Sequence, residues 1–566
     1  MKNYVLTTPY EEKLDKELPH GFYPRPSLKR ASYFSLNGPW GFEINENETE
    51  AEYKGTILVP FAPESRLSGV ERIVGKKEYM HYKRLFTLPE GFKKDRVILH
   101  FGAVDTVCQV LINGSEVGSH EGGYLPFSFD ITEKLREGEN ELILHIKDGI
   151  DKRYPYGKQT YKRGGMWYTP VSGIWQTVWL ESLPERYIKS LKITPDTEGV
   201  TVEVTGGENK KTLTLLDSGE SFSFDGESIR IEPRDKRLWT PENPYLYEFR
   251  IECGEDLIES YFALRKIEVG SFDRVKRVLL NKKPYLFNAL LDQGYYPDGI
   301  FTPATYEGYL DDIKLVKSLG FNTIRKHIKI EPEIFYYLCD REGVAVFQDM
   351  VNNSDYSFIR DTALPTVGLQ KLNDKRLHPD PVSRKQFISD MLKTAEHLFN
   401  FPSVLYYTVF NEGWGQFASE KAYRLLKSTD PTRIIDTTSG WFRCSTSDVD
   451  SRHIYFKTLK LKAPTGEPVC ISEFGGYSHR VDGHVFGEDN YGYRLYKSRE
   501  EFEDAFVSLY ENEVAPLIEK GAFAFVYTQL SDVEDETNGL ITYDRRVVKL
   551  NRERVCRVMA SIFKNN

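Results

Sequence analysis

Short segments of alternating apolar and polar residues, separated by turn residues, occupy the chain up to about Leu183. This period-two pattern is typical of strands with one buried face, and the close spacing of the segments predicts a β-sandwich over residues 1–183. Residues 184–270 alternate in the same way but are more polar, and they fit a smaller immunoglobulin-like sandwich. Within the first sandwich, Asn113-Gly114 separates two apolar runs and predicts a two-residue hairpin turn.

After about Ser271 the pattern changes to apolar runs that alternate with amphipathic helical segments. Eight runs are predicted to be strands: 285–291, 321–327, 344–350, 404–410, 433–437, 453–456, 469–476 and 522–527. Eight strands with helices between most of them are what a (β/α)8 TIM barrel requires. We therefore expect a multidomain protein in which two β-sandwiches precede a barrel over residues 271–566.

Composition excludes several classes of partner. The net charge is −9 with 28% charged residues, so there is no basic excess to attract nucleic acid or an anionic membrane. No stretch approaches the roughly 18 apolar residues of a membrane span, and the N-terminus lacks the apolar core of a signal peptide. The six cysteines are far apart and mostly inside apolar runs, which favours buried free thiols over disulfides. These features predict a cytoplasmic protein with no bound metal or cofactor.

Two of the eight predicted strands end in a glutamate followed by glycine-rich backbone: the fourth at Glu412 and the seventh at Glu473. In a barrel of this kind the C-terminal strand ends carry the chemistry, and strands four and seven lie across the barrel from each other. We therefore expect these side chains to meet over its mouth. Retaining glycoside hydrolysis requires two carboxyl groups about 5–5.5 Å apart. A single strand-end glutamate is equally compatible with a helix cap or a solvated loop, so the interpretation depends on the pair.

Motifs spread from about Arg25 to Arg545 resemble those of glycoside hydrolase family 2, the family of β-galactosidases, β-glucuronidases and β-mannosidases. They occupy residues 36–40, 59–61, 101–105, 112–114, 173–175, 325–327, 338–343, 411–412 and 472–475. The resemblance implies a jelly-roll sugar-binding domain, an immunoglobulin-like domain and a catalytic barrel. It also implies that Glu412 is the acid/base, that Glu473 is the nucleophile, and that Asn411 hydrogen-bonds the 2-hydroxyl of the sugar.

Further candidates for sugar contacts lie near the predicted strand ends. Arg325 and His327 are two residues apart on one strand face, where they either contact the sugar or orient a carboxylate. Asp349 ends the third strand and would hold a sugar hydroxyl or brace the acid/base glutamate. His453 and Tyr455 share a face of the sixth strand, where the tyrosine either tunes the nucleophile or packs in the core. One or two contacts are also expected from the residues just past strand ends, namely Asp292, Trp414, Trp441 and Tyr527.

Departures from the family pattern bear on the substrate. Glycine occupies position 165, where β-galactosidases carry an aspartate before the Met-Trp pair, and residues 348–352 lack their metal-binding segment, so no Mg²⁺ site of that type is expected. The tail 537–545 lacks the Asn-x-Lys pair with which β-glucuronidases hold the uronate, although an arginine could substitute. We expect a retaining exo-β-glycosidase acting on a neutral hexoside, a galactoside or mannoside, with a pentopyranoside or a glucuronide as alternatives.

The expected partner is a small-molecule or oligosaccharide β-glycoside, and a homo-oligomer is left open because family members often associate. A catalytically inactive carbohydrate-binding homologue with the same fold is the rival interpretation, and the presence of both glutamates argues against it. The acidic run at 532–536 follows the last strand, where it forms either a solvated loop or part of the pocket rim.

Overall fold

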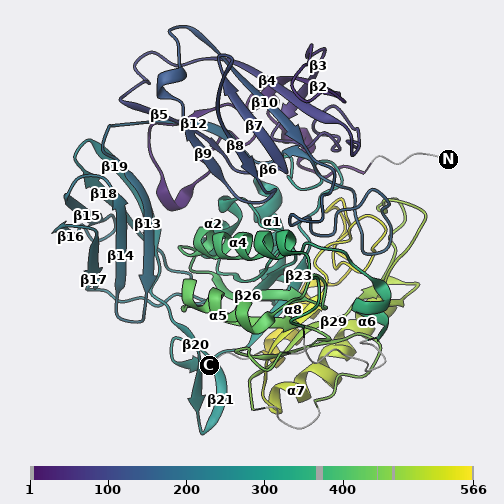
Figure 1. Ribbon diagram of the computed structural model, residues 1–566. Helices are drawn as coiled ribbons and strands as arrows, with labels where there is room; N and C mark the ends of the chain where they lie inside the picture. Colours follow the sequence, from purple (N-terminus) through teal and green to yellow (C-terminus); the bar gives the residue numbers. More distant parts are fainter. Residues whose placement is uncertain (1–5, 365–373, 443, 462–465, 564–566) are drawn as a thin grey trace.

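The computed structural model describes residues 6–364, 374–442, 444–461 and 466–563. Residues 1–5, which begin the N-terminal stretch considered above, lie outside the described residues. Figure 1 shows a β-sandwich at the top, a smaller sandwich at the left, and a barrel surrounded by helices below them. The predicted architecture, two β-sandwiches followed by a TIM barrel, is confirmed.

The N-terminal jelly roll consists of two antiparallel sheets whose apolar faces enclose a core that includes Trp40 and Tyr82. The predicted hairpin is present, because Asn113 (φ 52°) and Gly114 (φ 77°) both adopt the left-handed conformation that a type I′ turn requires. In order, the sheets contain β1 (Phe34–Ser35), β12 (Val178–Leu183), β5 (Arg96–Phe101) and β9 (Phe127–Asp130), and then β3 (Gly55–Val59), β2 (Gly38–Asn45), β4 (Tyr79–Thr87), β10 (Glu139–Lys147), β7 (Val107–Ile112) and β8 (Ser115–Glu121). The short strands β6 (Val104–Asp105) and β11 (Gly173–Ile174) pair beside them.

The immunoglobulin-like sandwich also has two antiparallel sheets, and every second residue of its strand Tyr247–Cys253 is buried. The sheets contain β13 (Ile188–Pro195), β14 (Val200–Gly206) and β17 (Ser228–Ile231), and then β16 (Ser221–Asp225), β15 (Lys210–Leu215), β18 (Tyr247–Cys253) and β19 (Asp256–Phe262). A small sheet of β20 (Ile267–Phe272), β21 (Val275–Leu280) and β22 (Lys283–Pro284) follows. Trp239 joins this part to the barrel, because its indole is fully buried and donates a 2.9 Å hydrogen bond to the carbonyl of Asp340.

The barrel contains all eight predicted strands in one parallel sheet. Their order is β27 (Ile434–Ser439), β26 (Val404–Asn411), β25 (Ala345–Asp349), β24 (Thr323–Lys326), β23 (Phe287–Asp292), β32 (Ala522–Thr528), β29 (Val469–Gly475) and β28 (Asp450–Ile454). The end strands β27 and β28 lie against each other, which brings the two edges of the sheet together. They form no hydrogen-bonded ladder, so the barrel is nearly but not fully closed. All eight residues of β26 are buried, as an unbroken apolar and aromatic run predicts.

Helices cover the outside of the barrel (Figure 1). They are α1 (Glu307–Ser318), α2 (Glu333–Glu342), α4 (Pro381–Leu398), α5 (Ser419–Thr429), α6 (Arg499–Leu509), α7 (Ala515–Glu519) and α8 (Arg552–Ile562). Local chemistry fixes their ends: Asp380 caps α4 by accepting a 2.8 Å bond from the Ser383 amide, and Gly343 ends α2 with φ 72°.

The cysteines are free thiols, as the sequence predicted, and four of them are buried: Cys108, Cys253, Cys339 and Cys470. No helix within the described ranges is long and apolar enough to cross a membrane.

Candidate active site

A pocket lies at the C-terminal ends of the barrel strands. Part of its wall comes from the jelly-roll segment that follows β10, which extends over the barrel mouth. The described residues that line it are Lys158, Met166, Trp167, Leu291, Gln293, His327, Ile328, Tyr356, Asn411, Glu412, Trp414, Tyr455, Glu473, Tyr493, Thr528 and Glu536. This position, where side chains of several strands converge, is where TIM barrels carry their chemistry.

Two carboxylates from opposite sides of the barrel face each other in this pocket. Glu412 follows β26 directly, and Glu473 belongs to β29. One oxygen of each carboxylate and one ring nitrogen of His453 all lie within 4.8 Å of one another. This spacing is close to the separation of about 5–5.5 Å between the carboxyl groups of retaining glycosidases.

Glu473 is held in its ionised form by the groups around it. The guanidinium of Arg325 donates to Oε1 at 3.1 Å, and the hydroxyl of Tyr455 donates to Oε2 at 2.5 Å. Burial by itself raises the pKa of this carboxyl, but the nearby charges of His453 and Arg325, with the hydrogen bond from Tyr455, lower the pKa of Glu473 below its usual value. Both oxygens therefore have a donor, and the group is an anion at neutral pH.

Arg325 organises this side of the pocket without lining it. Its side chain is 1% exposed and also donates to Oδ1 of Asn411 at 2.9 Å and to Oδ1 of Asp349 at 3.0 Å. Asn411 also lines the pocket, and with Oδ1 accepting from Arg325 its amide nitrogen has two hydrogens to donate. Asp349 also accepts a 2.6 Å bond from Nδ1 of His327, and these partners lower the pKa of its buried carboxyl despite the opposing effect of burial.

Glu412 is positioned by a strained turn and by a histidine. Its φ of 52° is uncommon for a residue other than glycine, and its amide donates to the carbonyl of Ser439 at 2.9 Å. Its Oε1 lies 2.8 Å from Nδ1 of His453, whose Nε2 is 3.0 Å from the Ser439 hydroxyl. The turn and the histidine together direct the carboxylate into the pocket beside Glu473.

Strand alternation explains two candidates that do not reach the pocket. Asp292 points outward from the barrel and binds Lys326 at 2.6 Å, whereas its neighbour Gln293 lines the pocket. Tyr527 likewise packs outward against the ring of Phe506, and the next residue, Thr528, lines the pocket instead. In both cases the sequence-based choice was one residue off, which moves a side chain to the opposite face of the strand.

Two further candidates lie outside the pocket wall. Trp441 packs edge to face on the ring of His453, with centroids 5.7 Å apart, and does not line the pocket. Asp349 is 1% exposed and, rather than holding a sugar or bracing Glu412, it orients Arg325 and His327. Trp414 lines the pocket, as expected.

Several pocket residues were not found by sequence reasoning. Lys158 and Trp167 belong to the jelly-roll segment, and no local pattern places that segment over a barrel that begins a hundred residues later. The acidic run at 532–536 is buried rather than solvated, and Glu536 reaches the pocket while accepting bonds from the hydroxyl of Tyr168 and from Nδ2 of Asn538. Arg545, the tail arginine, is instead paired with Asp312 at 3.2 Å.

The pocket is narrow. Its volume is about 40 Å³, room for a few water molecules. Three aromatic side chains pack edge to face at its rim. The ring of Trp167 contacts both Tyr356 and Trp414, with centroids 5.1 Å and 5.2 Å apart. These side chains have to shift to admit a sugar ring.

Glu412, His453 and Glu473 are also the one set of three His, Cys, Asp or Glu side chains, within the described ranges, close enough to share a metal ion. Arg325 and Tyr455 already bind both oxygens of Glu473, and a buried guanidinium beside that carboxylate opposes a divalent cation. The donor set therefore suits an organic substrate better than a metal.

Comparison with known proteins identifies the class. The model "Glycosyl hydrolase 2 galactose-binding domain-like" matches residues 54–170, and "Glycosyl hydrolases family 2, TIM barrel domain" matches residues 276–470. A β-galactosidase of Pseudoalteromonas haloplanktis is 23% identical over 87% of this chain and 49% of its own length. A β-glucuronidase of Paenibacillus borealis is 24% identical over 73% of both chains.

Solved structures show the same fold. The β-glucuronidase of Bifidobacterium dentium superposes with a TM-score of 0.76 at 19% identity, over 95% of this chain and 99% of the other. A β-galacturonidase from Eisenbergiella tayi gives 0.70 at 20% identity, over 94% and 98%. The chain belongs to glycoside hydrolase family 2. It spans about half the length of the first β-galactosidases it matches.

Proposed function

We propose that this protein is a retaining exo-β-glycosidase that removes the terminal non-reducing sugar of a β-glycoside. The observation that carries the proposal is the pair Glu412 and Glu473, which share one pocket and the partner His453, while Glu473 alone also binds Arg325 and Tyr455. Glu473 is bound by a guanidinium and a phenol and is kept ionised, as a nucleophile requires. The pocket lies at the barrel mouth, and a single terminal sugar would enter it after the side chains at its rim shift.

In the first step, Glu473 attacks the anomeric carbon while Glu412 gives its proton to the glycosidic oxygen, so that the C–O bond breaks and the aglycone leaves as an alcohol. In the second step, Glu412 takes a proton from water, which attacks the same carbon and releases Glu473. Two displacements return the original β configuration. The amide nitrogen of Asn411 is the group available to bond the 2-hydroxyl, because Arg325 occupies its oxygen.

The direct test is a panel of nitrophenyl β-glycosides, with NMR used to identify the anomer of the product first formed. Turnover with retained configuration is expected. An inverted first product would exclude the double-displacement mechanism, and no turnover on any sugar would favour a carbohydrate-binding protein without activity.

We favour a neutral hexoside, a galactoside or mannoside, as the substrate. Glu536 lines the pocket as a third carboxylate, fixed by Tyr168 and Asn538. Such a group accepts hydrogen bonds from sugar hydroxyls and repels a sugar carboxylate. Glu536→Gln is therefore expected to weaken kcat/KM on the preferred neutral glycoside about 10-fold or more, because a hydrogen bond to a charged group contributes roughly 1.5–3 kcal/mol.

A uronide is the second candidate, and the observation that favours it is Lys158. This lysine lines the pocket and is close enough to His327 for its charge to contribute, after burial, to lowering the pKa of that ring. Solved β-glucuronidase and β-galacturonidase structures also share the fold. Lys158→Met separates the two: loss of activity on glucuronide and galacturonide, with the neutral sugars unaffected, would identify a uronidase.

A further inference from the structure

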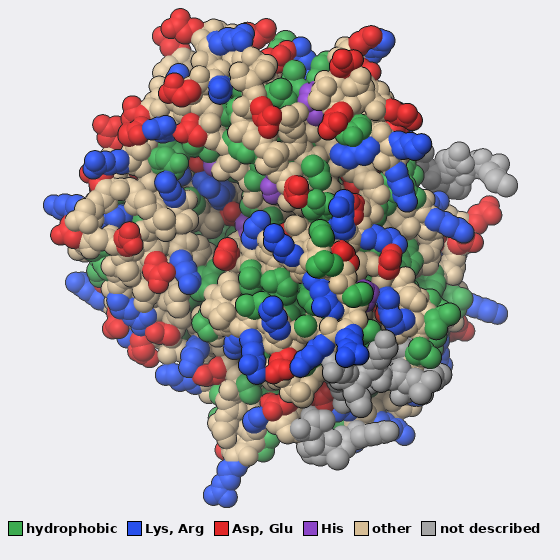
Figure 2. Space-filling view, viewed as in Figure 1, with side chains coloured by type: hydrophobic (Ala, Val, Ile, Leu, Met, Phe, Trp, Pro, Cys, Tyr) green, Lys and Arg blue, Asp and Glu red, His purple; other side chains and the backbone are tan. Residues whose placement is uncertain are grey.

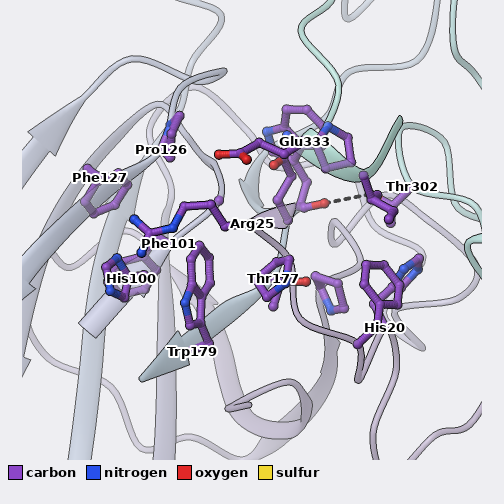
Figure 3. A pocket seen from close by; sticks show the side chains of 18 of the residues that line it. His20, Arg25, His100, Phe101, Pro126, Phe127, Thr177, Trp179, Thr302 and Glu333 are labelled. Carbon is purple, nitrogen blue, oxygen red and sulfur yellow. Dashed lines mark hydrogen bonds between the residues drawn. The ribbon is translucent and has the colours of Figure 1, made fainter. Parts of the chain in front are cut away.

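Hydrogen bonds fix the jelly roll and the N-terminal segment to the barrel around the cavity shown in Figure 3. The hydroxyl of Thr302 donates to the carbonyl of Trp175 at 2.6 Å, and Glu333 accepts a 2.6 Å bond from the Ser27 hydroxyl. Figure 2 shows acidic and basic side chains mixed on the face where the jelly roll meets the barrel. The junction determines which jelly-roll side chains reach the barrel mouth.

Tyr168 of the jelly roll contacts a buried carboxylate of the barrel. Its hydroxyl donates to Oε2 of Glu536, and Nδ2 of Asn538 donates to Oε1 at 3.0 Å. Burial, together with the nearby carboxylate, raises the pKa of the Tyr168 phenol well above its usual value, so the phenol keeps its proton and donates. Both oxygens of Glu536 therefore accept, as in a carboxylate, which has no hydrogen to donate.

Two further amides extend this contact into a chain of hydrogen bonds. Gln529 donates from Nε2 to Oδ1 of Asn538 at 2.7 Å, and Gln293 donates from Nε2 to Oε1 of Gln529 at 3.1 Å. All three amide side chains are buried. Gln293 and Glu536, the two ends of the chain, line the pocket of the catalytic glutamates, whereas the two residues between them do not.

The carboxylate sets the direction of every bond in this chain. Because Glu536 only accepts, Asn538 has to turn Nδ2 towards it and Oδ1 towards Gln529. That oxygen needs a donor, so Gln529 presents Nε2 to Asn538 and Oε1 to Gln293. By the same step, Gln293 presents Nε2 to Gln529. Turning any one amide over would place two oxygens or two N–H groups against each other, which a buried site tolerates poorly.

The amide oxygen of Gln293 is the group that this chain leaves over. Among the described residues no hydrogen bond to Oε1 of Gln293 occurs, and the residue lies in the pocket wall. An amide oxygen accepts hydrogen bonds and cannot donate them. A sugar hydroxyl can supply the missing hydrogen, whereas the carboxylate of a uronate cannot.

We propose that Gln293 is a specificity-determining residue, whose Oε1 accepts a hydrogen bond from one free hydroxyl of the terminal sugar. Gln529 and Asn538 are positioning residues, because they fix the orientation of the Gln293 amide without lining the pocket. The inference rests on the proposed glycosidase function for the class of ligand. It makes the wall between Gln293 and Glu536 a surface of acceptors, which selects sugars with free hydroxyl groups on that side.

The experiment compares the hydroxyl groups of the sugar one at a time. The full-length Glu473→Gln chain, which lacks the proposed nucleophile, is titrated with methyl β-D-galactoside and methyl β-D-mannoside. It is also titrated with analogues in which each hydroxyl in turn, other than the 2-hydroxyl assigned to Asn411, is replaced by fluorine, which cannot donate. Kd is measured by tryptophan fluorescence, since Trp167 and Trp414 line the pocket.

Three substitutions are added to this chain. Gln293→Met removes the accepting oxygen, and Gln529→Met removes the contact that orients it. Gln386→Met is the matched control, because Gln386 is a half-buried glutamine on the outer helix α4, where it donates to Asp390 at 3.1 Å. Each comparison is made between ligands of one variant, so it does not depend on how much of that variant folds.

Replacing the hydroxyl that reaches Gln293 should raise Kd about 2- to 12-fold, the effect of one hydrogen bond of roughly 0.5–1.5 kcal/mol. Gln293→Met should abolish this penalty at that one position and keep the penalties at the others. Gln529→Met should reduce the penalty at the same position, and Gln386→Met should change none.

A Gln293→Met chain that binds the natural sugar and all of its analogues more weakly by the same factor would overturn the proposal, since that is the effect of a purely structural role. Kd does not depend on turnover, so this result is separate from a failure of the glycosidase assignment, which the turnover panel detects.

Discussion

Nδ1 of His453 lies 2.8 Å from Oε1 of Glu412 and 3.4 Å from Oε2 of Glu473, so one imidazole contacts both carboxylates of the pocket. Its other nitrogen is 3.0 Å from the Ser439 hydroxyl. The ring is therefore held at both ends, and it links the acid/base candidate to the nucleophile candidate. Burial raises the pKa of Glu473, and His453 is among the neighbouring groups that lower this pKa.

We therefore expect His453→Asn to reduce kcat about 10- to 100-fold, because a hydrogen bond to a charged group contributes roughly 1.5–3 kcal/mol. The acid limb of the pH profile of kcat/KM should also move to higher pH, since the pKa of Glu473 rises when a group that lowers it is removed. His479→Asn is the control, a partly buried histidine that does not line the pocket. A reduced rate with an unchanged acid limb would contradict the electrostatic role.

The two glutamates should respond differently to removal. Glu473→Gln is expected to abolish turnover, because no glycosyl ester forms without the nucleophile. Glu412→Ala should lose about 10²–10⁴-fold on substrates with poor leaving groups and much less on activated aryl glycosides, which leave without a proton. Added azide should partly restore Glu412→Ala on activated substrates and yield a β-glycosyl azide.

Glu420→Ala, at an exposed position of α5, controls for the loss of a carboxylate elsewhere. An α-glycosyl azide from the Glu412→Ala chain, or near wild-type rates from Glu473→Gln, would refute the assignment of roles.

The fold follows from patterns that are local in sequence. Alternating exposure along Tyr247–Cys253 and complete burial of Val404–Asn411 match the period-two and unbroken apolar runs from which those strands were predicted. The eight barrel strands occur along the chain where they were predicted. The hydrophobic pattern of each strand could be recognised from its own residues, because it depends only on which of them are buried.

The pocket could be predicted only in part. A strand-end position was readable, but which of two successive residues faces inward depends on the phase of the strand, and Asp292 and Tyr527 were chosen where Gln293 and Thr528 face the pocket. Side chains two residues apart on a strand point the same way, so the inward-facing Leu291 implies that Gln293 also faces the pocket. Lys158 had no local signal at all, because its place in the pocket results from the docking of one domain on another.

Gly413 should be intolerant of a side chain. It has φ 75°, and a Cβ at this position would lie 2.2 Å from Cδ2 of Phe442. We expect Gly413→Ala to lower kcat at least 10-fold, because relieving this clash moves the turn that carries Glu412. Gly219→Ala is the matched control: its φ is 70°, but nothing lies within 4 Å of an added Cβ. Equal loss of activity in both variants would show that general destabilisation, not displacement of the turn, is responsible.

Glu64 should make the stability of the jelly roll depend on pH. Burial raises the pKa of this carboxyl to about 7, although the Ser172 amide donates to it at 3.1 Å. An unfolded glutamate has a pKa of about 4.3, so between about pH 4 and 7 the folded state binds more protons than the unfolded state. The free energy of unfolding therefore falls as the pH rises through this window. Glu64→Gln keeps a neutral group of the same size and should flatten this fall, measured as Tm from pH 4.5 to 8. Glu90 is an exposed glutamate, so the control variant Glu90→Gln should leave the pH dependence of Tm unchanged. If Tm falls as steeply with pH in Glu64→Gln as in the wild type, other groups cause the pH dependence.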